Sequence, residues 1–138
     1  MIEKIDHIGI AVESIDKSLP LYTEALGLKP GEIHVIEGGK LRIVMIPVGE
    51  SKIELLESRD PQDTISKFIR DQGEGIHHLA LEVRNIEAEL SILGRDKAKH
   101  VELIDEIPRP GVEGGKIAFF QPRGSRIQLE LVEPRDTQ

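Results

Sequence analysis

The stretch Asp6-His7-Ile8-Gly9-Ile10-Ala11-Val12 decides the fold, because the chain carries a second version of it in His77-His78-Leu79-Ala80-Leu81-Glu82-Val83. Aligning the two stretches brings His7 opposite His78. Each stretch alternates aliphatic residues with small or polar ones, which is the period of a half-buried β-strand. A strand that occurs twice predicts two copies of one structural unit.

A second pair of matched segments closes the two copies. The first segment is Ile53-Glu54-Leu55-Leu56-Glu57 and the second is Leu129-Glu130-Leu131-Val132-Glu133, so Glu54 corresponds to Glu130. Each of these two glutamates lies between aliphatic residues, and strand alternation therefore turns it to the opposite face of its sheet. One histidine and one glutamate thus recur at equivalent places in both halves.

The residues between these segments predict the order β-α-β-β-β in each half. In the first half, a strand over 2–12 precedes a helix that Ser14 caps and Gly27 ends, with Pro20 as an awkward interior residue. The remaining strands are expected over 30–37, 40–48 and 51–57. In the second half, Asn85 caps the helix, and strands are expected over 76–84, 100–104, 116–121 and 126–133.

A short helix should link the two halves. Asp60 and Pro61 have the residue types of a helix cap and a first helical residue, so we expect this helix over about 60–73. The chain length of 138 residues fits a single domain over 1–138. Within it, module one should occupy about 1–58 and module two about 75–134.

The two sides of the first strand differ in the size of their side chains. Ile8, Ile10 and Val12 point one way, while His7 shares the other side with glycine and alanine. Small residues beside a histidine leave room for a ligand. We therefore expect an α+β fold, in which two tandem βαβββ modules form a curved mixed sheet around a metal-binding cleft, with the helices on the aliphatic sides.

Composition excludes several classes of protein. The net charge of −7 opposes non-specific binding to nucleic acid, which depends on neutralising phosphates with lysine and arginine. The absence of cysteine excludes disulfides, thiolate metal sites and a cysteine nucleophile. The first twenty residues include four acidic ones and no long apolar run, so we expect neither a signal peptide nor a membrane span, and a cytoplasmic location.

The repeated residues have the ligand chemistry of a divalent metal site. Two imidazoles and two carboxylates form an N2O2 set that suits a six-coordinate Co, Mn, Ni, Fe or Zn ion with two open positions: His7, Glu54, His78 and Glu130. A single histidine on a strand is more often a core or surface residue, and a single glutamate is usually solvated. Repetition of the pair in both halves favours the metal site over that interpretation.

The other histidines and matched glutamates have plainer interpretations. Strand alternation turns His77 away from the predicted ligand face, so its role should be structural. His34 and His100 have no counterpart in the repeat and are expected at the surface. Glu57 and Glu133 match between the halves, but they lie on the aliphatic side at strand ends and are expected to be solvated.

A segment rich in proline and glycine, 108–115, predicts a mobile loop over the mouth of the cleft. It lacks the spacing of a phosphate-binding fingerprint and does not open a helix. Nearby basic residues could give an anionic substrate a local positive patch, although single charges are more often plain surface: Arg109, Lys116, Arg123 and Arg126.

Four segments, 6–12, 53–56, 75–83 and 129–132, resemble the vicinal oxygen chelate superfamily. That superfamily includes glyoxalase I, extradiol dioxygenases, fosfomycin-resistance enzymes and methylmalonyl-CoA epimerase. Within it, the segments 75–80, 104–111 and 115–119 are most similar to methylmalonyl-CoA epimerase, and the likeness spans nearly the whole chain.

The resemblance implies paired βαβββ modules and a divalent ion, Co, Mn, Ni or Zn, held by His7, Glu54, His78 and Glu130. It implies interconversion of the two C2 epimers of methylmalonyl-CoA, with a metal-stabilised enolate and with Glu130 as a catalytic acid/base. It also implies an acyl-CoA substrate as partner and a homodimer, while the composition predicts no nucleic acid and no membrane as partners.

Two departures from the epimerase pattern stand out. The family's second acid/base glutamate comes from the third strand of the first half, where residues 40–45 offer no carboxylate, so water, Glu54 or another group would have to serve. Residues 121–126 also differ from the family's His-Pro and longer turn. The alternatives are a glyoxalase I-type lactoylglutathione lyase, which shares the four ligands, and a non-catalytic small-molecule binding protein.

Overall fold

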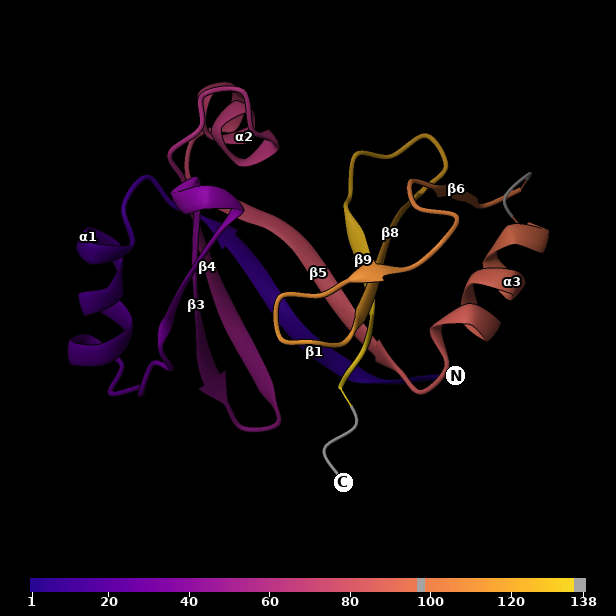
Figure 1. Ribbon diagram of the computed structural model, residues 1–138, viewed down its shortest axis with the longest axis horizontal. Helices are drawn as coiled ribbons and strands as arrows, with labels where there is room; N and C mark the ends of the chain where they lie inside the picture. Colours follow the sequence, from indigo (N-terminus) through magenta and orange to yellow (C-terminus); the bar gives the residue numbers. More distant parts are fainter. Residues whose placement is uncertain (97–98, 136–138) are drawn as a thin grey trace. The chain divides into compact units, whose positions relative to one another are not determined.

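The computed structural model describes residues 1–96 and 99–135, which fall into two compact units (Figure 1). One unit runs from His7 to His77. The other combines Met1–Asp6 with the chain from His78 onward. Strands β1 (Ile2–Ala11) and β5 (Gly75–Val83) therefore each contribute residues to both units.

The unit from His7 to His77 contains a four-stranded sheet in the order β2-β3-β4-β1. Its strands besides β1 are β2 (Ile33–Ile36), β3 (Leu41–Val48) and β4 (Ser51–Ser58). β1 runs parallel to β4, whereas β3 runs antiparallel to both β2 and β4. The predicted β-α-β-β-β order of the first half is confirmed, and β2 is shorter than expected.

The first helix, α1 (Ile15–Pro20), begins where the sequence predicts. The Ser14 hydroxyl accepts a hydrogen bond from the Lys17 N–H at 3.2 Å and so caps the helix. Pro20 ends regular α-helix, because proline has no N–H to continue the hydrogen-bond ladder. The chain continues as a π-helical turn, η1 (Leu21–Ala25), which closes with a 3.0 Å bond from the Leu26 N–H to the Leu21 carbonyl.

The linker helix, α2 (Thr64–Gln72), starts later than predicted. Its cap is Asp63, whose side chain accepts the Ile65 N–H at 3.3 Å. Asp60 instead accepts the Gln62 N–H at 3.0 Å and forms a turn before the helix. The predicted Asp60 cap is therefore wrong, because an aspartate that bonds two residues ahead makes an Asx turn as readily as a helix start.

The helices of this unit cover both faces of its sheet. α1 packs on the aliphatic face with Val12, Val44 and Leu55, as predicted. α2 packs on the other face, through Ile65, over a cluster that includes Ala11, Ile43 and Leu56. The expectation that helices cover only the aliphatic side is thus wrong at this end of the sheet. On the face that carries His7, α2 covers the end with Ala11 and Leu56.

The second unit repeats the arrangement. Its strands run in the order β5-β9-β8-β6, with α3 (Ile86–Asp96) after β5; the remaining bounds are β6 (Val101–Leu103), β8 (Lys116–Pro122) and β9 (Leu129–Glu133). β5 runs parallel to β9, as β1 does to β4. The Asn85 side chain accepts the Ala88 N–H at 3.1 Å, which confirms the predicted cap. α3 packs on an aliphatic cluster that includes Val83, Ala118 and Leu131.

The segment predicted as a loop contains a short strand. β7 (Arg109–Pro110) pairs antiparallel with β8, and the turn after it closes with a 2.8 Å bond from the Gly111 N–H to the Gly115 carbonyl. Gly115 is required here, because a Cβ on it would lie 2.2 Å from the Glu133 carbonyl oxygen. Over the described residues, no helix is long and apolar enough to cross a membrane.

Candidate metal centre

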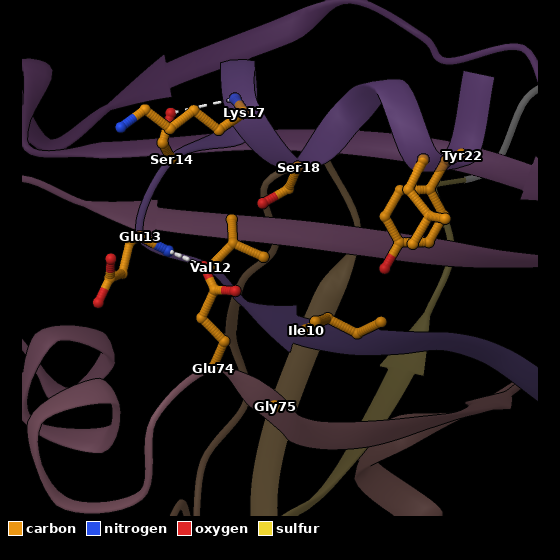
Figure 2. A pocket seen from close by; sticks show the side chains of 10 residues that line it. Ile10, Val12, Glu13, Ser14, Lys17, Ser18, Tyr22, Glu74 and Gly75 are labelled. Carbon is orange, nitrogen blue, oxygen red and sulfur yellow. Dashed lines mark hydrogen bonds between the residues drawn. The ribbon is translucent and has the colours of Figure 1, made fainter. Parts of the chain in front are cut away.

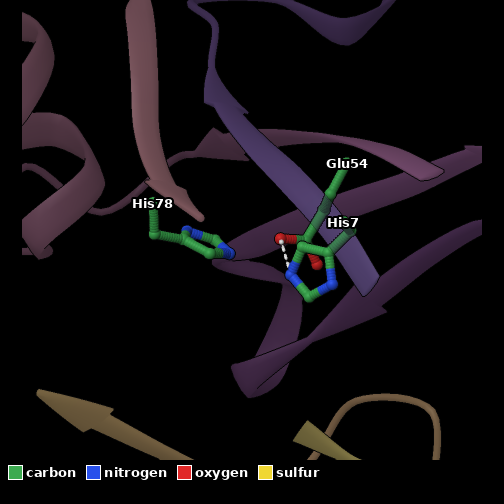
Figure 3. Close-up of side chains that lie close together, drawn as sticks. All are labelled: His7, Glu54 and His78. Atoms are coloured by element: carbon green, nitrogen blue, oxygen red, sulfur yellow. Dashed lines mark ion pairs between the residues drawn. The ribbon is translucent and has the colours of Figure 1, made fainter. Parts of the chain in front are cut away.

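The first predicted pair, His7 and Glu54, lies on neighbouring strands of one unit (Figure 3). Gly9 pairs with Glu54 across β1 and β4, so the histidine two residues earlier shares a face with the glutamate. The His7 Nε2 lies 3.4 Å from the Glu54 Oε1, and both side chains are 6% exposed. Parallel pairing of the first and last strands thus produces the contact that the sequence predicts.

The second pair, His78 and Glu130, has the same construction in the other unit. Ala80 pairs with Glu130 across β5 and β9, which repeats the register of the first pair. The His78 Nε2 lies 3.6 Å from the Glu130 Oε1, and the side chains are 5% and 6% exposed. The duplication therefore extends from sequence to side-chain geometry.

The spacing and burial of the two pairs fit a divalent cation. Separations of 3.4 and 3.6 Å exceed the usual N–H···O distance of about 2.9 Å. Two ligands at about 2.1 Å from a six-coordinate ion would lie roughly 3.0 Å apart in adjacent positions and roughly 4.2 Å apart in opposite ones, and both observed separations fall between these values. Buried carboxylates are costly unless they are paired or bind a metal. His7, Glu54 and His78 each offer a ligand atom of the type that such an ion takes, whereas Glu130 is outside that group.

An aromatic ring neighbours the second pair. Phe119 of β8 pairs with Glu130 across the sheet, and its ring meets the His78 ring edge to face, with centroids 5.8 Å apart. Phe119 is not among the site residues predicted from the sequence. Strand alternation could have found it, since Phe119 faces the same way as a glutamate already under consideration.

Two of the four residues of the predicted positive patch, Arg109 and Lys116, have acidic partners. Arg109 Nε lies 3.2 Å from an Asp105 carboxylate oxygen, and Lys116 donates to Glu87 at 2.8 Å. That hydrogen bond lowers the pKa of Glu87 and raises the pKa of Lys116. Arg123 donates to the Val101 carbonyl at 3.3 Å. Arg109 differs from the others, because its guanidinium also lies over the Phe119 ring, 5.4 Å from the centroid.

The prediction that Glu57 and Glu133 are solvated is wrong for Glu57, which is 5% exposed. Each glutamate reaches from the last strand of its half to the first helix, where it accepts the N–H of Ile15 at 2.8 Å or of Ile86 at 3.1 Å. Arg59 and Arg42 also donate to Glu57, at 3.2 and 3.3 Å. These glutamates recur in the repeat because they tie strand to helix.

The environment of Glu57 changes its acidity. Burial alone would raise the pKa of Glu57. The hydrogen bond from Ile15 and the positive charges of Arg59 and Arg42 act in the opposite direction and outweigh burial. The pKa of Glu57 therefore lies below its ordinary value, and the group is ionised at neutral pH.

The remaining histidines have structural or surface positions, as predicted. His77 packs against the Phe68 ring of α2, with ring centroids 5.3 Å apart. His34 and His100 are exposed, and His100 lies 3.0 Å from an Asp96 carboxylate oxygen. Neither exposed histidine lies beside a predicted metal ligand in sequence.

A separate pocket of about 740 Å³ lies beside α1 (Figure 2). Its lining includes aliphatic residues of β1 and its end, residues in and next to α1 and η1, and one glutamate: Ile10, Val12, Ser14, Lys17, Ser18, Tyr22 and Glu74. The Glu74 carboxylate accepts the Glu13 N–H at 2.8 Å at its edge. Strand alternation places this pocket on the opposite face of the sheet from His7 and Glu54, so it is not part of the candidate metal centre.

Comparison with known proteins agrees with this geometry. The profile of the Glyoxalase/Bleomycin resistance protein/Dioxygenase superfamily matches residues 4–129. The methylmalonyl-CoA epimerase of Dictyostelium discoideum mitochondria is 31% identical over 134 residues, which cover 94% of this chain and 78% of that protein.

Two solved structures have the same fold. A hypothetical protein of Bacillus halodurans C-125 is 39% identical, with a TM-score of 0.89 over 98% of this chain and 96% of that chain. A variant of Streptomyces coelicolor methylmalonyl-CoA epimerase in complex with 2-nitronate-propionyl-CoA is 28% identical, with a TM-score of 0.88 over 100% of this chain and 99% of that chain. The predicted α+β class with paired βαβββ modules is confirmed.

Proposed function

The chain belongs to the Glyoxalase/Bleomycin resistance protein/Dioxygenase superfamily, and we propose that it is a metal-dependent epimerase that interconverts the two C2 epimers of methylmalonyl-CoA. The observation that carries the metal dependence is the matched pair of buried histidine and glutamate side chains, with the same strand register in each module. The choice of reaction rests on the relatives named above, because the ligand set alone is common to several activities of the superfamily.

We propose His7, Glu54, His78 and Glu130 as the ligands of one divalent ion, of the Co, Mn, Ni or Zn type. Such an ion, when bound, supplies Lewis acidity that stabilises negative charge developing on the oxygens of a carbonyl substrate. In this case the whole chain works as one domain, and both modules contribute ligands. Its support is the donor chemistry, the burial and the repeated spacing of the two pairs.

Glu130 is our candidate for the group that removes or returns the C2 proton. Its side chain is 6% exposed, and Phe119 pairs with it across β8 and β9. A proton transfer at this carboxylate would therefore be shielded from bulk water. Met45 occupies the position opposite Glu54 on β3, and no carboxylate of β3 faces the site. The acid/base on the other side of C2 would therefore be a water molecule, Glu54 or another group.

The test is proton exchange at C2. We expect purified protein, incubated with a single epimer of methylmalonyl-CoA in deuterated water, to invert the centre and incorporate deuterium at C2. Treatment with a chelator should abolish both, and returning the metal should restore them, because the negative charge of the deprotonated substrate is otherwise unstabilised. Absence of metal-dependent deuterium incorporation would rule the epimerase out.

The alternative functions predict different results when the protein is assayed with each substrate. A glyoxalase I-type lyase would convert the hemithioacetal of methylglyoxal and glutathione, and would leave methylmalonyl-CoA unexchanged. A non-catalytic binding protein would turn over neither substrate. The shared ligand set makes the glyoxalase reaction the second candidate, and parallel assays with both substrates separate the two.

The cellular setting is part of the proposal. We propose an acyl-CoA as the partner molecule, in line with the relatives, and a homodimer in the cytoplasm. Size-exclusion chromatography with light scattering measures the oligomeric state directly. The net charge of −7 continues to argue against nucleic acid as a partner.

A further inference from the structure

Arg109 is linked to the second histidine–glutamate pair through the Phe119 ring. Its guanidinium lies over the Phe119 ring, 5.4 Å from the centroid. The same ring meets His78 edge to face at 5.8 Å. Arg109 is therefore one aromatic ring away from a proposed metal ligand, and a cation over a ring face is attracted to it.

Backbone and carboxylate contacts fix this arrangement. Asp105 accepts the Phe119 N–H at 2.9 Å through one oxygen, and lies 3.2 Å from the Arg109 Nε through the other. The N–H groups of Ile104 and Asp105 both donate to the Phe119 carbonyl at 3.0 Å. β7 adds a pairing between Arg109 and Ile117. The side chain is thus positioned in advance, with little rotational freedom left to lose on binding a ligand.

The guanidinium retains donors for a ligand. Asp105 is contacted through Nε, the inner nitrogen, whereas four of the five N–H donors of arginine lie on the two terminal nitrogens. The Arg109 side chain is 54% exposed, so an incoming anion can reach it. The planar guanidinium can donate two parallel hydrogen bonds to the two oxygens of a carboxylate.

The first module has no aromatic ring at the position that supports this cation in the second module. Across its last two strands, the position opposite Glu54 is Met45, where the second module has Phe119 opposite Glu130. The two modules therefore repeat the predicted ligands but differ beside them.

We infer that Arg109 is a specificity-determining residue that binds the free carboxylate of the acyl group, and so selects malonyl-type thioesters over neutral acyl thioesters. This inference rests on the proposed function for its choice of substrate. The phosphates of coenzyme A are the other anions of such a substrate. They lie at the far end of the long pantetheine arm, whereas Arg109 lies one ring from His78.

The test compares two thioesters that differ in that carboxylate alone. Calorimetric titration of the metal-loaded protein with malonyl-CoA and with propionyl-CoA should show that wild type prefers malonyl-CoA. We expect Arg109→Gln to weaken malonyl-CoA binding roughly tenfold to a hundredfold, the usual range for a lost charge-assisted hydrogen bond, and to leave propionyl-CoA binding unchanged. Arg109→Lys should recover part of the lost malonyl-CoA affinity, because lysine restores the positive charge but not the two parallel hydrogen-bond donors.

Arg95→Gln is the matched control, since it removes the same charge from exposed surface of α3. It should leave both affinities unchanged, and equal melting temperatures for all variants would establish that folding is intact. Equal weakening of both thioesters in Arg109→Gln, no change in either, or no preference in wild type would each overturn the inference. Failure of deuterium exchange with a retained malonyl-CoA preference would instead overturn the epimerase and leave the role of Arg109 standing.

Discussion

Glu54 and Glu57 lie three residues apart on β4, on opposite faces, and satisfy their buried carboxylates in different ways. Glu57 receives hydrogen bonds from Ile15, Arg59 and Arg42. Glu54 faces His7 at 3.4 Å. The hydrogen bonds to Glu57 satisfy its carboxylate and give it a structural role. A carboxylate that faces an imidazole nitrogen, as Glu54 does, can bind a cation together with that nitrogen.

Glu57→Gln should destabilise the fold by about 2 kcal/mol at neutral pH, because it replaces charge-assisted hydrogen bonds with neutral ones. Chemical denaturation would measure the loss. Glu133→Gln is the matched control. Its carboxylate accepts the corresponding helix N–H but is 25% exposed, so its loss should be smaller. A larger loss at Glu133 would contradict this interpretation.

The acidity of Glu57 makes the same contribution dependent on pH. Because the folded-state pKa lies below its ordinary value, the ionised carboxylate stabilises the fold above the unfolded pKa, which is near 4.5. That stabilisation should be lost as pH falls through the folded pKa. The difference in unfolding free energy between wild type and Glu57→Gln should therefore be largest near neutrality and shrink in acid. A difference that grows in acid would mean that the pKa is raised instead.

At the scale of elements, the turn that joins β7 to β8 depends on glycine. Gly115→Ala should destabilise the fold by several kcal/mol or prevent folding, because its Cβ would collide with the Glu133 carbonyl backbone at 2.2 Å. Thermal melting would measure the loss. Gly94→Ala in α3 is the control, since no atom lies within 4 Å of its Cβ, and alanine should be neutral or stabilise the helix by up to about 1 kcal/mol.

Element order was predictable because hydrophobic period and caps agree along most of the chain. The bounds of the elements were less predictable, because two local structures compete at some of their ends. Asp60 was predicted as a helix cap, but its side chain forms a turn and Asp63 caps α2 instead. Arg109 and Pro110 were predicted in a loop, but β8 offers them a partner that sequence period cannot reveal.

At the scale of the whole molecule, bound metal should stabilise the fold, because an ion that binds only the folded state shifts the equilibrium toward it. We expect chelator to lower the melting temperature by several degrees. In His7→Ala and Glu130→Ala, metal retained after dialysis should fall to a small fraction of the wild-type amount, and chelator should no longer affect melting. Elemental analysis and calorimetry would measure both quantities.

His34→Ala is the control for this experiment, because His34 is an exposed histidine on β2. It should retain metal as wild type does. Full metal retention in either ligand variant would contradict a shared ion and would favour a site confined to one module.

The duplication explains which residues of the candidate site could be found from sequence. His7 and His78 stand out because the same strand register occurs twice. Phe119 and Asp105 do not stand out, because the first module has Met45 opposite its glutamate and no matching contact. Comparison of the halves therefore reveals what they share, and the residues that could distinguish one substrate from another lie where the halves differ.

Met1–Asp6 belong to the same unit as the chain from His78 onward, and this limits how the chain can be divided into fragments. A cut in the segment between β4 and α2 would not release two self-sufficient fragments, since the front fragment would keep a strand segment that the back one needs. Separate expression of the two repeats should fail for the same reason.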